Sequence, residues 1–322
     1  MSIPDDVRAA AEARAAARAA RDWPTADRLR GEIESAGWKV VDTGVSYRLE
    51  PSHAADVVIG DAIRYGRSDA VPSRLADPST GLATVAIVAR DDPGGAARAA
   101  RSVLAHAPAE VDVVVVGDGL SDARVAEIAP LAAGSERLEL IRTSAVLGQG
   151  AALNITARRA TGELLVIIDP SVELTGEAIT PLANVLRDPE VAIAGPFGLR
   201  SGDLRHFEEV TTDPAVAIEG YVQAFRRADV VRRGPFDEAF RFYRNLDIWW
   251  SLVLRDAGEG QPPRRAAIVD GLPVSRHDHV AWTSTPASER DRLSKRNFYR
   301  VLDRFRDRLD LAIPEGPAGP IG

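Results

Sequence analysis

Acidic residues follow three apolar runs of the sequence, at positions where side chains could bind a ligand. The runs end in Ala89-Arg90-Asp91, Gly117-Asp118-Gly119 and Asp169-Pro170-Ser171. Each run is rich in Val, Ile or Leu without alternation, which is typical of a parallel strand covered on both faces. In open α/β sheets, ligands bind outside the carboxyl ends of such strands. The sequence therefore predicts a ligand site at this edge, although each carboxylate alone could also cap the turn that follows it.

Three carboxylates at one edge of a sheet predict a bound cation, because clustered negative charge without a partner is costly. A nucleotide with a divalent metal ion, Mg²⁺ or Mn²⁺, would supply that partner. Between the second and third runs, VLGQGAALNITARRATGE places Gly148 and Gly150 just before a helix, where backbone can approach a ligand closely. Their spacing matches neither a dinucleotide fingerprint nor a P-loop.

Histidines and tryptophans near the carboxyl end form a second group of candidates. In SRHDHVAW, His277 and His279 stand two residues apart and Trp282 follows. On an extended segment both imidazoles would point to one side, which predicts a metal site or a contact to a diphosphate. A structural pair bonded to backbone is the alternative. Trp249, Trp250 and Trp282 could form a wall on which the ring of an acceptor molecule stacks. Alternatively, Trp249 and Trp250 lie in the core on the apolar face of a helix.

The elements that must position these residues alternate between strand and helix from residue 83 onward. Such alternation with short connections predicts an α/β fold with a parallel sheet covered by helices. Strands are expected over residues 84–89, 111–116, 138–142 and 163–168. Helices are expected over residues 95–105, after Ser121 and over residues 151–160.

The sheet domain is expected to span residues 83–287. The sequence of residues 288–312 predicts a charged amphipathic helix that follows it. Its apolar side comprises Leu293, Phe298, Val301, Leu302 and Phe305. Because acidic residues intersperse the basic ones, docking on the sheet domain is favoured over a membrane contact. The final residues 313–322 are expected to be disordered.

Residues 1–50 predict a separate small module. Two helices are expected over residues 4–36, the second beginning after Asp22 and closing at Gly37, and a two-stranded ribbon should turn at residues 42–44. The stretch RAARDWPTADRLRGEIESAGWKVVDTGVSYRL resembles the small C-terminal appendage of cysteinyl-tRNA synthetases. That resemblance implies a weak RNA or protein contact without aminoacylation, or simply a docking module. Residues 51–82 are interpreted as a connector lying along the next domain.

Composition limits the classes of function. The chain has 47 acidic and 40 basic residues, a formal charge of −7, so nucleic-acid binding is unlikely except through a local patch. It has no cysteine, which excludes disulfides, thiolate nucleophiles and cysteine zinc sites. No run predicts a membrane span, and the first residues lack the order of a secretory signal, so we expect a cytoplasmic protein.

Four motifs together resemble family 2 glycosyltransferases of the GT-A fold. They are TVAIVARDD, VVVVGDGLSD, LGQGAALNITARRATGELLVIIDPSVE and GPFDEAF followed by LDIWWSLVLRDAG, in the family's order over about residues 83–310. The resemblance implies a GT-A nucleotide-diphospho-sugar transferase-like sheet covered by helices, here preceded by the small helical hairpin and ribbon. It also implies a nucleoside-diphosphate sugar as donor and a divalent metal ion.

The resemblance assigns roles to individual residues. Asp247 aligns with the catalytic base. Asp169 aligns with the first residue of the metal-binding Asp-x-Asp, where His277 and His279 could complete the site. The residues implied in nucleotide or donor binding are Ala89, Asp91, Asp118, Gly148, Asn154 and Asp169.

The sequence also departs from the family pattern. The second Asp of Asp-x-Asp is Ser171, and the acid before the base is Leu246. One carboxylate with phosphates and waters can still hold Mg²⁺, so these changes weaken a metal site without abolishing it. Our hypothesis is an inverting glycosyltransferase with an unidentified acceptor. The alternatives are a catalytically degenerate module that binds nucleotide sugars and an RNA-associated adaptor acting through residues 1–50.

Overall fold

A nine-stranded sheet forms the centre of the protein. The computed structural model describes residues 3–44, 46–258 and 260–313. The sheet has the order β15-β10-β14-β8-β5-β6-β7-β4-β3. Its strands are β3 (Val57–Ile59), β4 (Ala62–Tyr65), β5 (Gly81–Ala89), β6 (Val111–Gly117), β7 (Leu138–Thr143), β8 (Gly162–Ile168), β10 (Val191–Gly195), β14 (Val222–Arg226) and β15 (Arg265–Ile268).

The middle of the sheet is parallel, and the antiparallel pairs lie to either side. Strands β8, β5, β6, β7 and β4 run parallel, whereas β14 is antiparallel to β8 and β10, and β3 is antiparallel to β4. The strand ends that carry Asp91, Asp118 and Asp169 therefore meet at one edge. This arrangement confirms the predicted α/β sheet.

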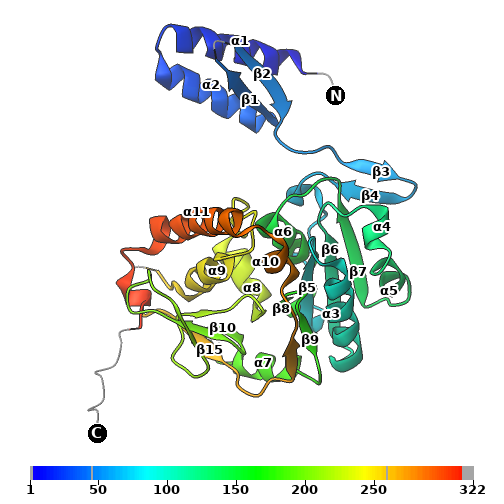
Figure 1. Ribbon diagram of the computed structural model, residues 1–322. Helices are drawn as coiled ribbons and strands as arrows, with labels where there is room; N and C mark the ends of the chain where they lie inside the picture. The colour runs from blue at the N-terminus through cyan, green and yellow to red at the C-terminus, as the bar shows by residue number, and fades with distance from the viewer. Residues whose placement is uncertain (1–2, 45, 259, 314–322) are drawn as a thin grey trace.

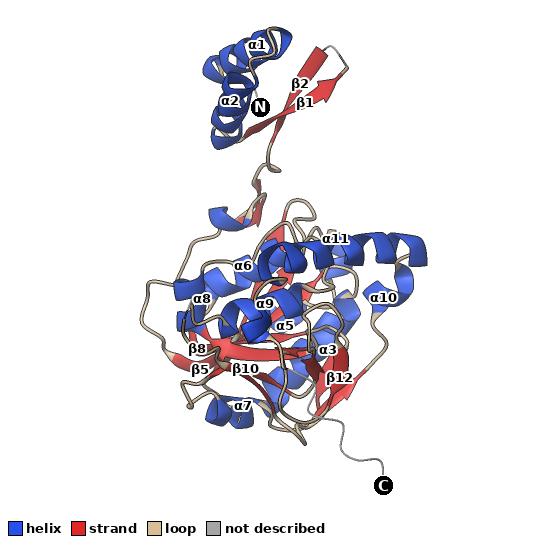
Figure 2. Ribbon diagram, turned by 90° about the vertical axis from the view of Figure 1, so that its left-hand side faces the viewer, coloured by secondary structure: helices blue, strands red, loops and turns tan. Residues whose placement is uncertain are grey.

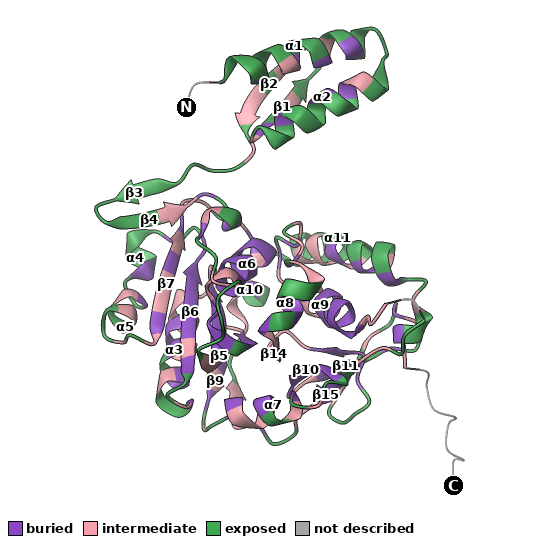
Figure 3. Cartoon of the chain, turned by 180° about the vertical axis from the view of Figure 1, so that it is seen from behind, coloured by how far each residue is buried: buried purple, intermediate pink, exposed green. Residues whose placement is uncertain are grey.

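Helices cover both faces of the sheet (Figures 1 and 2). They are α3 (Pro93–His106), α4 (Asp122–Val125), α5 (Ala129–Ala133), α6 (Gln149–Arg159), α7 (Ile179–Val185), α8 (Arg227–Arg233), α9 (Leu246–Arg255), α10 (Val280–Ser284) and α11 (Ala287–Phe305), with a 3₁₀ turn at Leu309–Leu311. Along β5, Ala86 and Val88 belong to the cluster with α6 and α9, whereas Val85 and Ile87 belong to the cluster with α3 and α7. Figure 3 shows that burial is concentrated in the central strands and in α6 and α9.

Two small sheets complete this part of the chain. One joins β11 (Gly198–Arg200), β12 (Glu208–Val210) and β13 (Ala217–Ile218), and the other pairs β9 (Val172–Leu174) with β16 (Val274–Arg276). The second pair brings the segment after β16 back to the end of β8. The short strand β9 thus ties the predicted histidine segment to Asp169.

The first fifty residues form the expected helices and ribbon. They comprise α1 (Asp5–Ala19), α2 (Trp23–Ser35), β1 (Trp38–Thr43) and β2 (Ser46–Pro51). The side chain of Asp22 caps α2 by accepting the Thr25 N–H, and Gly37, at φ 81°, follows the helix. A separate apolar cluster formed by Val7, Ala11, Ile33 and Trp38 gives these elements their own core. In Figure 1 this module lies beyond the edge of the sheet.

The connector is more ordered than the sequence indicated. Part of residues 51–82 forms β3 and β4, and β4 pairs in parallel with β7. Its register is also fixed by the Ser144 N–H, which donates to the Tyr65 carbonyl at 2.9 Å, and by the Ser144 hydroxyl, which donates to the Ala55 carbonyl at 2.7 Å. The connector therefore extends the sheet.

The predicted C-terminal helix corresponds to α11. Val301 and Phe305 are buried, and Phe298 packs partly buried against the same cluster. The expected disordered tail, apart from Ile313, lies outside the described residues. Within the described ranges, every helix is too short or too polar to serve as a membrane-spanning segment.

Two truncations should separate the module from the connector. A chain beginning at residue 52 should keep the thermal midpoint of the sheet domain within about 2 °C, because the module has its own core. A chain beginning at residue 67 removes β3 and β4, uncovers the edge of β7, and should lower that midpoint by about 4 °C or more. Differential scanning calorimetry measures both. An equally large loss from the shorter deletion would show that the module stabilises the sheet domain.

Candidate functional site

A cavity of about 510 Å³ opens beside the end of β8, with a narrow extension of about 50 Å³ toward the end of β5. The two spaces share walls made by Gln149, Ile167, Asp169, Gly220, Tyr243 and His279. The extension reaches Asp91 and Ser171, whereas the larger space reaches Asp247, Glu219 and Trp282. The two spaces therefore adjoin, and Asp169 lies on the wall of both.

Asp169 is held tightly at the end of β8. Its Oδ1 accepts the Ser171 N–H at 2.8 Å and the Ser171 hydroxyl at 2.5 Å, and its Oδ2 lies 3.3 Å from Nε2 of His279. Burial tends to raise the pKa of Asp169, but the contacts with His279 and Ser171 outweigh it and hold that pKa below its ordinary value. Asp169 is thus a carboxylate at neutral pH.

His279 is placed by a helix-cap hydrogen bond and by ring stacking, in addition to its contact with Asp169. It caps α10, where its Nδ1 accepts the Trp282 N–H at 3.2 Å, and its ring stacks on Tyr243 with centroids 4.4 Å apart. Burial tends to lower the pKa of His279, but Asp169 outweighs burial and raises it. This geometry leaves Nε2 directed at Asp169.

His277 does not join this site, so the prediction that both imidazoles point to one side was wrong. Its Nε2 lies 2.9 Å from Oε2 of Glu173, and its N–H donates to the Ser171 carbonyl at 2.7 Å. The alternation fails because β16 ends at Arg276 and the chain then turns into the cap of α10. His277 is a structural residue of the β9–β16 pair.

Asp247 lies at the start of α9 and faces the larger space. Its Oδ2 accepts the Gly220 N–H and its Oδ1 accepts the Ile248 N–H, each at 3.0 Å. Burial raises the pKa of Asp247 against the opposing effect of these two hydrogen bonds. A carboxylate with fixed orientation and increased basicity is suited to accept a proton.

Asp118 was predicted to contact a nucleotide, but its carboxylate is fully enclosed. Its oxygens accept the N–H groups of Leu147 at 2.7 Å and Gly148 at 3.0 Å, and the Thr143 hydroxyl lies 3.2 Å away. Burial raises its pKa although both amides oppose this shift. Asp118 therefore fixes the loop before α6, and the predicted direct contact was wrong.

Gly148 and Asn154 also have structural roles in place of the predicted donor contacts. Gly148 adopts φ 106°, and a Cβ there would lie 2.7 Å from the Cα of Arg241. The close approach is thus to another part of the chain. Asn154 is buried, and it accepts the Phe236 N–H at 2.8 Å and donates to the Phe236 carbonyl at 3.0 Å. It ties α6 to the backbone at Phe236.

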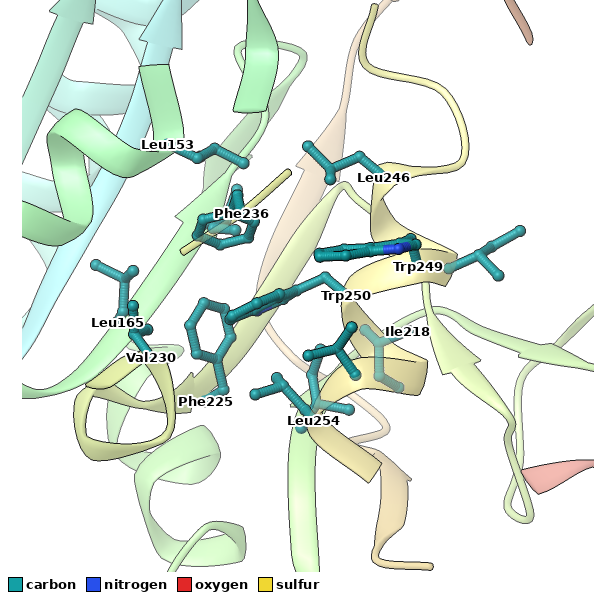
Figure 4. Packing of buried hydrophobic residues seen from close by; sticks show 14 of the residues in the cluster. Leu153, Leu165, Ile218, Phe225, Val230, Phe236, Leu246, Trp249, Trp250 and Leu254 are labelled. Atoms are coloured by element: carbon teal, nitrogen blue, oxygen red, sulfur yellow. The ribbon is translucent and has the colours of Figure 1, made fainter. Parts of the chain in front are cut away.

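Trp249 and Trp250 belong to the core, which corrects their proposed role as an acceptor wall. Trp250 has no exposed surface and packs against Phe225 and Phe236, while Trp249 is 6% exposed (Figure 4). Neither lines the cavity. Trp282 does line it, with the guanidinium groups of Arg244 and Arg290 over its ring at 4.8 and 3.7 Å from the centroid.

The end of strand β5 contributes one residue that a nucleotide could reach. Ala89 is completely buried, and its carbonyl accepts the Asp118 N–H at 3.0 Å, so its side chain is not available to a nucleotide. Asp91 is partly exposed and lines the narrow extension, where its carboxylate lies 3.0 Å from Nε of Arg90. Asp91 therefore remains the candidate nucleotide contact on this strand.

Sequence reasoning missed the turn that carries Glu219 and Tyr221. Both residues line the cavity, and the Asp169 N–H donates to the Tyr221 carbonyl at 3.0 Å. Burial, assisted by the charges of Glu209 and Asp247, raises the pKa of Glu219 to about 7. A signal was available, because Glu219 is the only carboxylate in the apolar stretch AVAIEGYVQAF.

With this geometry established, comparisons identify the class. The model of the family described as glycosyl transferase family 2 matches residues 84–246, about half of the chain. The chain belongs to glycosyl transferase family 2 and is a glycosyltransferase. The matched region contains the strand ends with Asp91 and Asp169 and ends one residue before Asp247.

Solved structures support the fold. The structure of GalNAc-T7 with UDP, GalNAc and Mn²⁺ has a TM-score of 0.58 at 16% identity and covers 71% of this chain and 49% of that protein. The mannosyltransferase PcManGT from Pyrobaculum calidifontis, in complex with GDP-Man and Mn²⁺, matches with a TM-score of 0.50 at 20% identity. The match covers 74% of this chain and 72% of the mannosyltransferase chain. The nine-stranded sheet is thus a GT-A glycosyltransferase fold.

A short region is similar to curated cysteine–tRNA ligases. The ligase of Opitutus terrae is 50% identical over 50 residues, which are 16% of this chain and 11% of the ligase. Cysteine–tRNA ligase 1 of Burkholderia lata is 45% identical over 49 residues, 15% of the chain and 10% of the ligase. The chain therefore spans about a tenth of these relatives, which agrees with the short resemblance seen in residues 7–49.

The donors at Asp169 fit a divalent metal ion held together with a diphosphate. In the described ranges, no three His, Cys, Asp or Glu residues gather into a complete metal site. Asp169 Oδ2 receives no hydrogen bond from Ser171 and could bind an ion, and His279 Nε2, 3.3 Å away, could join it only in the tautomer protonated at Nδ1, which requires the loss of the hydrogen bond from the Trp282 N–H. Two protein ligands suffice when phosphate oxygens and waters complete the shell.

Asp118→Ala should destabilise the protein through the loop before α6. The substitution leaves the Leu147 and Gly148 N–H groups buried without an acceptor, which should lower the free energy of unfolding by about 2–3 kcal/mol. Urea denaturation measures this loss. Glu136→Ala, which removes an exposed carboxylate from the connection between β6 and β7, should stay near wild type. Unchanged stability of Asp118→Ala together with lost nucleotide affinity would instead restore the direct contact.

Proposed function

We propose that the protein is an inverting glycosyltransferase that moves a sugar from a nucleoside-diphosphate sugar to an acceptor hydroxyl group. The observation that carries the proposal is the position of Asp247, fixed by two backbone amides on the wall of the cavity that also contains Asp169 and His279. The nucleoside diphosphates in the two neighbour structures support this choice of donor. Asp91 would contact the nucleotide in the narrow extension.

Asp247 acts as the general base in this proposal. Its carboxylate accepts the acceptor's hydroxyl proton as the oxygen forms a bond to the anomeric carbon of the donor. The bond from that carbon to the diphosphate oxygen breaks in the same displacement, which inverts the configuration. The electron pair of that bond leaves with the diphosphate, and the proton remains on Asp247. The raised pKa of Asp247 increases the driving force for this transfer.

Asp169 and His279 serve the departing diphosphate. They would hold a divalent ion, Mg²⁺ or Mn²⁺, which neutralises the charge that develops on the leaving group. Ser171 orients Asp169 through two hydrogen bonds to Oδ1 and leaves Oδ2 toward His279. The Tyr243 ring stacked on His279 limits rotation of the imidazole. These contacts preorganise the diphosphate half of the site.

The chain then has a catalytic unit and an appended module. Residues 83–287 would form the transferase domain and residues 288–312 a helix docked on it, with residues 51–82 as connector. The module over residues 1–50 would provide a weak contact to RNA or protein, as the similarity to cysteine–tRNA ligases suggests. Its arginines are partly paired, since Arg14 and Arg18 both lie near Asp42.

Asp247→Asn tests the enzyme hypothesis. Asparagine keeps the shape of the side chain and removes its basicity, so turnover should fall by about 10² or more while donor affinity changes little. Product formation is measured by chromatography with panels of nucleoside-diphosphate sugars and acceptors, and donor affinity by calorimetry. Equal losses of turnover and of donor affinity would show that Asp247 binds the donor. Absence of both transfer and donor hydrolysis in the wild type would favour a module that binds nucleotide sugars without turnover, in keeping with Ser171 and Leu246.

Ser171→Asp tests the metal. A second carboxylate beside Asp169 should tighten Mn²⁺-dependent binding of UDP or GDP, and without metal its repulsion should lower the thermal midpoint. Thermal-shift assays with and without Mn²⁺ report both effects, since a ligand at 100 times its dissociation constant stabilises by about 2.7 kcal/mol. Ser171→Asn is the uncharged control of similar size. If a chelator changes neither the wild type nor the Asp variant, arginines or His279 must neutralise the diphosphate without metal.

A further inference from the structure

The cavity contains a carboxyl group that the proposed mechanism does not use. Glu219 lies on the turn between β13 and β14 and lines the larger space together with Asp247. Within the described residues, its carboxyl group makes no hydrogen bond or ion pair, and only longer-range charges act on it. Its hydrogen-bonding capacity is therefore available to a ligand.

The backbone holds Glu219 beside the base. The Glu219 N–H donates to the Phe197 carbonyl at 2.8 Å, and the next N–H, of Gly220, donates to Asp247 at 3.0 Å. A Cβ built on Gly220 would lie 3.4 Å from the Cβ of Asp247, so this turn is packed directly against the base. Two carboxyl groups from different elements thus line the same space, and the turn that carries Glu219 packs against the side chain of Asp247.

The nearby arginines are engaged elsewhere. Arg276 lies over the rings of Phe197 and Tyr221, with its Cζ 4.5 and 4.8 Å from their centroids, and Arg244 lies over Trp282. Both lower the pKa of Glu219 only through their charge, and burial together with Glu209 and Asp247 outweighs them. Among the residues that the structure describes, Glu219 therefore lies near charged groups but has no hydrogen-bond or ion-pair partner.

Leu246 explains why a second carboxyl group would come from another element. The family's usual acid before the base is replaced here by a leucine that is 4% exposed and packed in the core (Figure 4). Asp247 uses one lone pair on each oxygen for the Gly220 and Ile248 amides. Each oxygen keeps a second lone pair, one of which the base needs for the hydroxyl proton, and Glu219 is a carboxyl group on the same wall that could bind a further hydroxyl group of the acceptor.

We infer that Glu219 binds the acceptor, and that the acceptor is a polyol or carbohydrate with two neighbouring hydroxyl groups, one at Asp247 and one at Glu219. The inference rests on the proposed function, because it takes Asp247 as the base. It adds a specificity residue and a substrate class. A site built to hydrogen-bond a hydroxyl group discriminates strongly against the analogue that lacks it, since its polar group is left unpaired.

Binding of glycosides to the protein with UDP and Mn²⁺ tests this inference without turnover. The probes are methyl glucoside, galactoside and mannoside, each with its monodeoxy derivatives, titrated by calorimetry. We expect at least one parent glycoside to bind. Glu219→Ala should weaken it about 100-fold, and removal of one hydroxyl group from the glycoside should weaken wild-type binding similarly. Glu219→Ala should no longer distinguish that deoxy derivative from its parent.

The pH dependence and two controls separate binding from structural damage. Affinity for the parent glycoside should rise as the pH increases through about 7, because the carboxylate accepts a stronger hydrogen bond than the acid, and Glu219→Gln should remove this inflection. Glu208→Ala changes an exposed acid on β12 and should leave glycoside affinity within about twofold. UDP affinity should be retained in Glu219→Ala, which shows that the site is intact.

Three results would overturn the inference. They are wild-type binding of none of the glycosides, unchanged affinity in Glu219→Ala, and equal discrimination of the deoxy derivative by wild type and variant. Failure of the proposed function is a different result: glycosides bind in a Glu219-dependent manner, but no donor sugar is transferred or hydrolysed. In that case Glu219 remains a ligand-binding residue of a protein without turnover.

Discussion

The antiparallel pairing of β14 with β8 is the constraint on which the rest of the site depends. It sets Val222 opposite Ile168, and the Asp169 N–H extends the pairing to the Tyr221 carbonyl. Asp169, which follows β8, is thereby joined to the turn that carries Glu219 and Gly220. The Gly220 N–H then orients the carboxylate of Asp247 on α9. A slip by one residue would move these side chains to the opposite face. One register therefore brings Asp169, Glu219 and Asp247 to the same cavity.

The charges at the edge of the sheet are offset by groups of the protein itself, and Arg90 lies near two of the three carboxylates, Asp91 and Asp118. Asp91 pairs with Arg90, Asp118 is enclosed by backbone amides, and Asp169 faces His279. The expectation that three clustered carboxylates require a metal overlooked these partners within the protein, because hydrogen bonds and nearby cations both favour the charged form of a carboxylate. Only the pair at Asp169 retains ligands suited to a divalent ion.

Local patterns predicted the parallel half of the fold and few of the contacts in the site. The runs ending at Ala89, Gly117 and Ile168 became β5, β6 and β8, since apolar strands and short connections are local properties. The separation of His277 from His279 depends on the pairing of β16 with β9, and the burial of Trp250 depends on Phe225 and Phe236 from distant segments. Such pairings are tertiary, and spacing along one sequence does not encode them.

The C-terminal helix shows how a distant segment completes the site. Asn297 on α11 is buried within the apolar side that the sequence predicted, and its amide donates to the Phe242 and Arg244 carbonyls at 2.8 and 2.9 Å. Asn245, which adopts φ 65°, donates in turn to the Ser294 carbonyl. These bonds fix the segment that stacks Tyr243 on His279 and then enters α9 at Asp247. Because this segment carries Tyr243 and leads to Asp247, the docking of α11 helps to determine the geometry of the cavity wall.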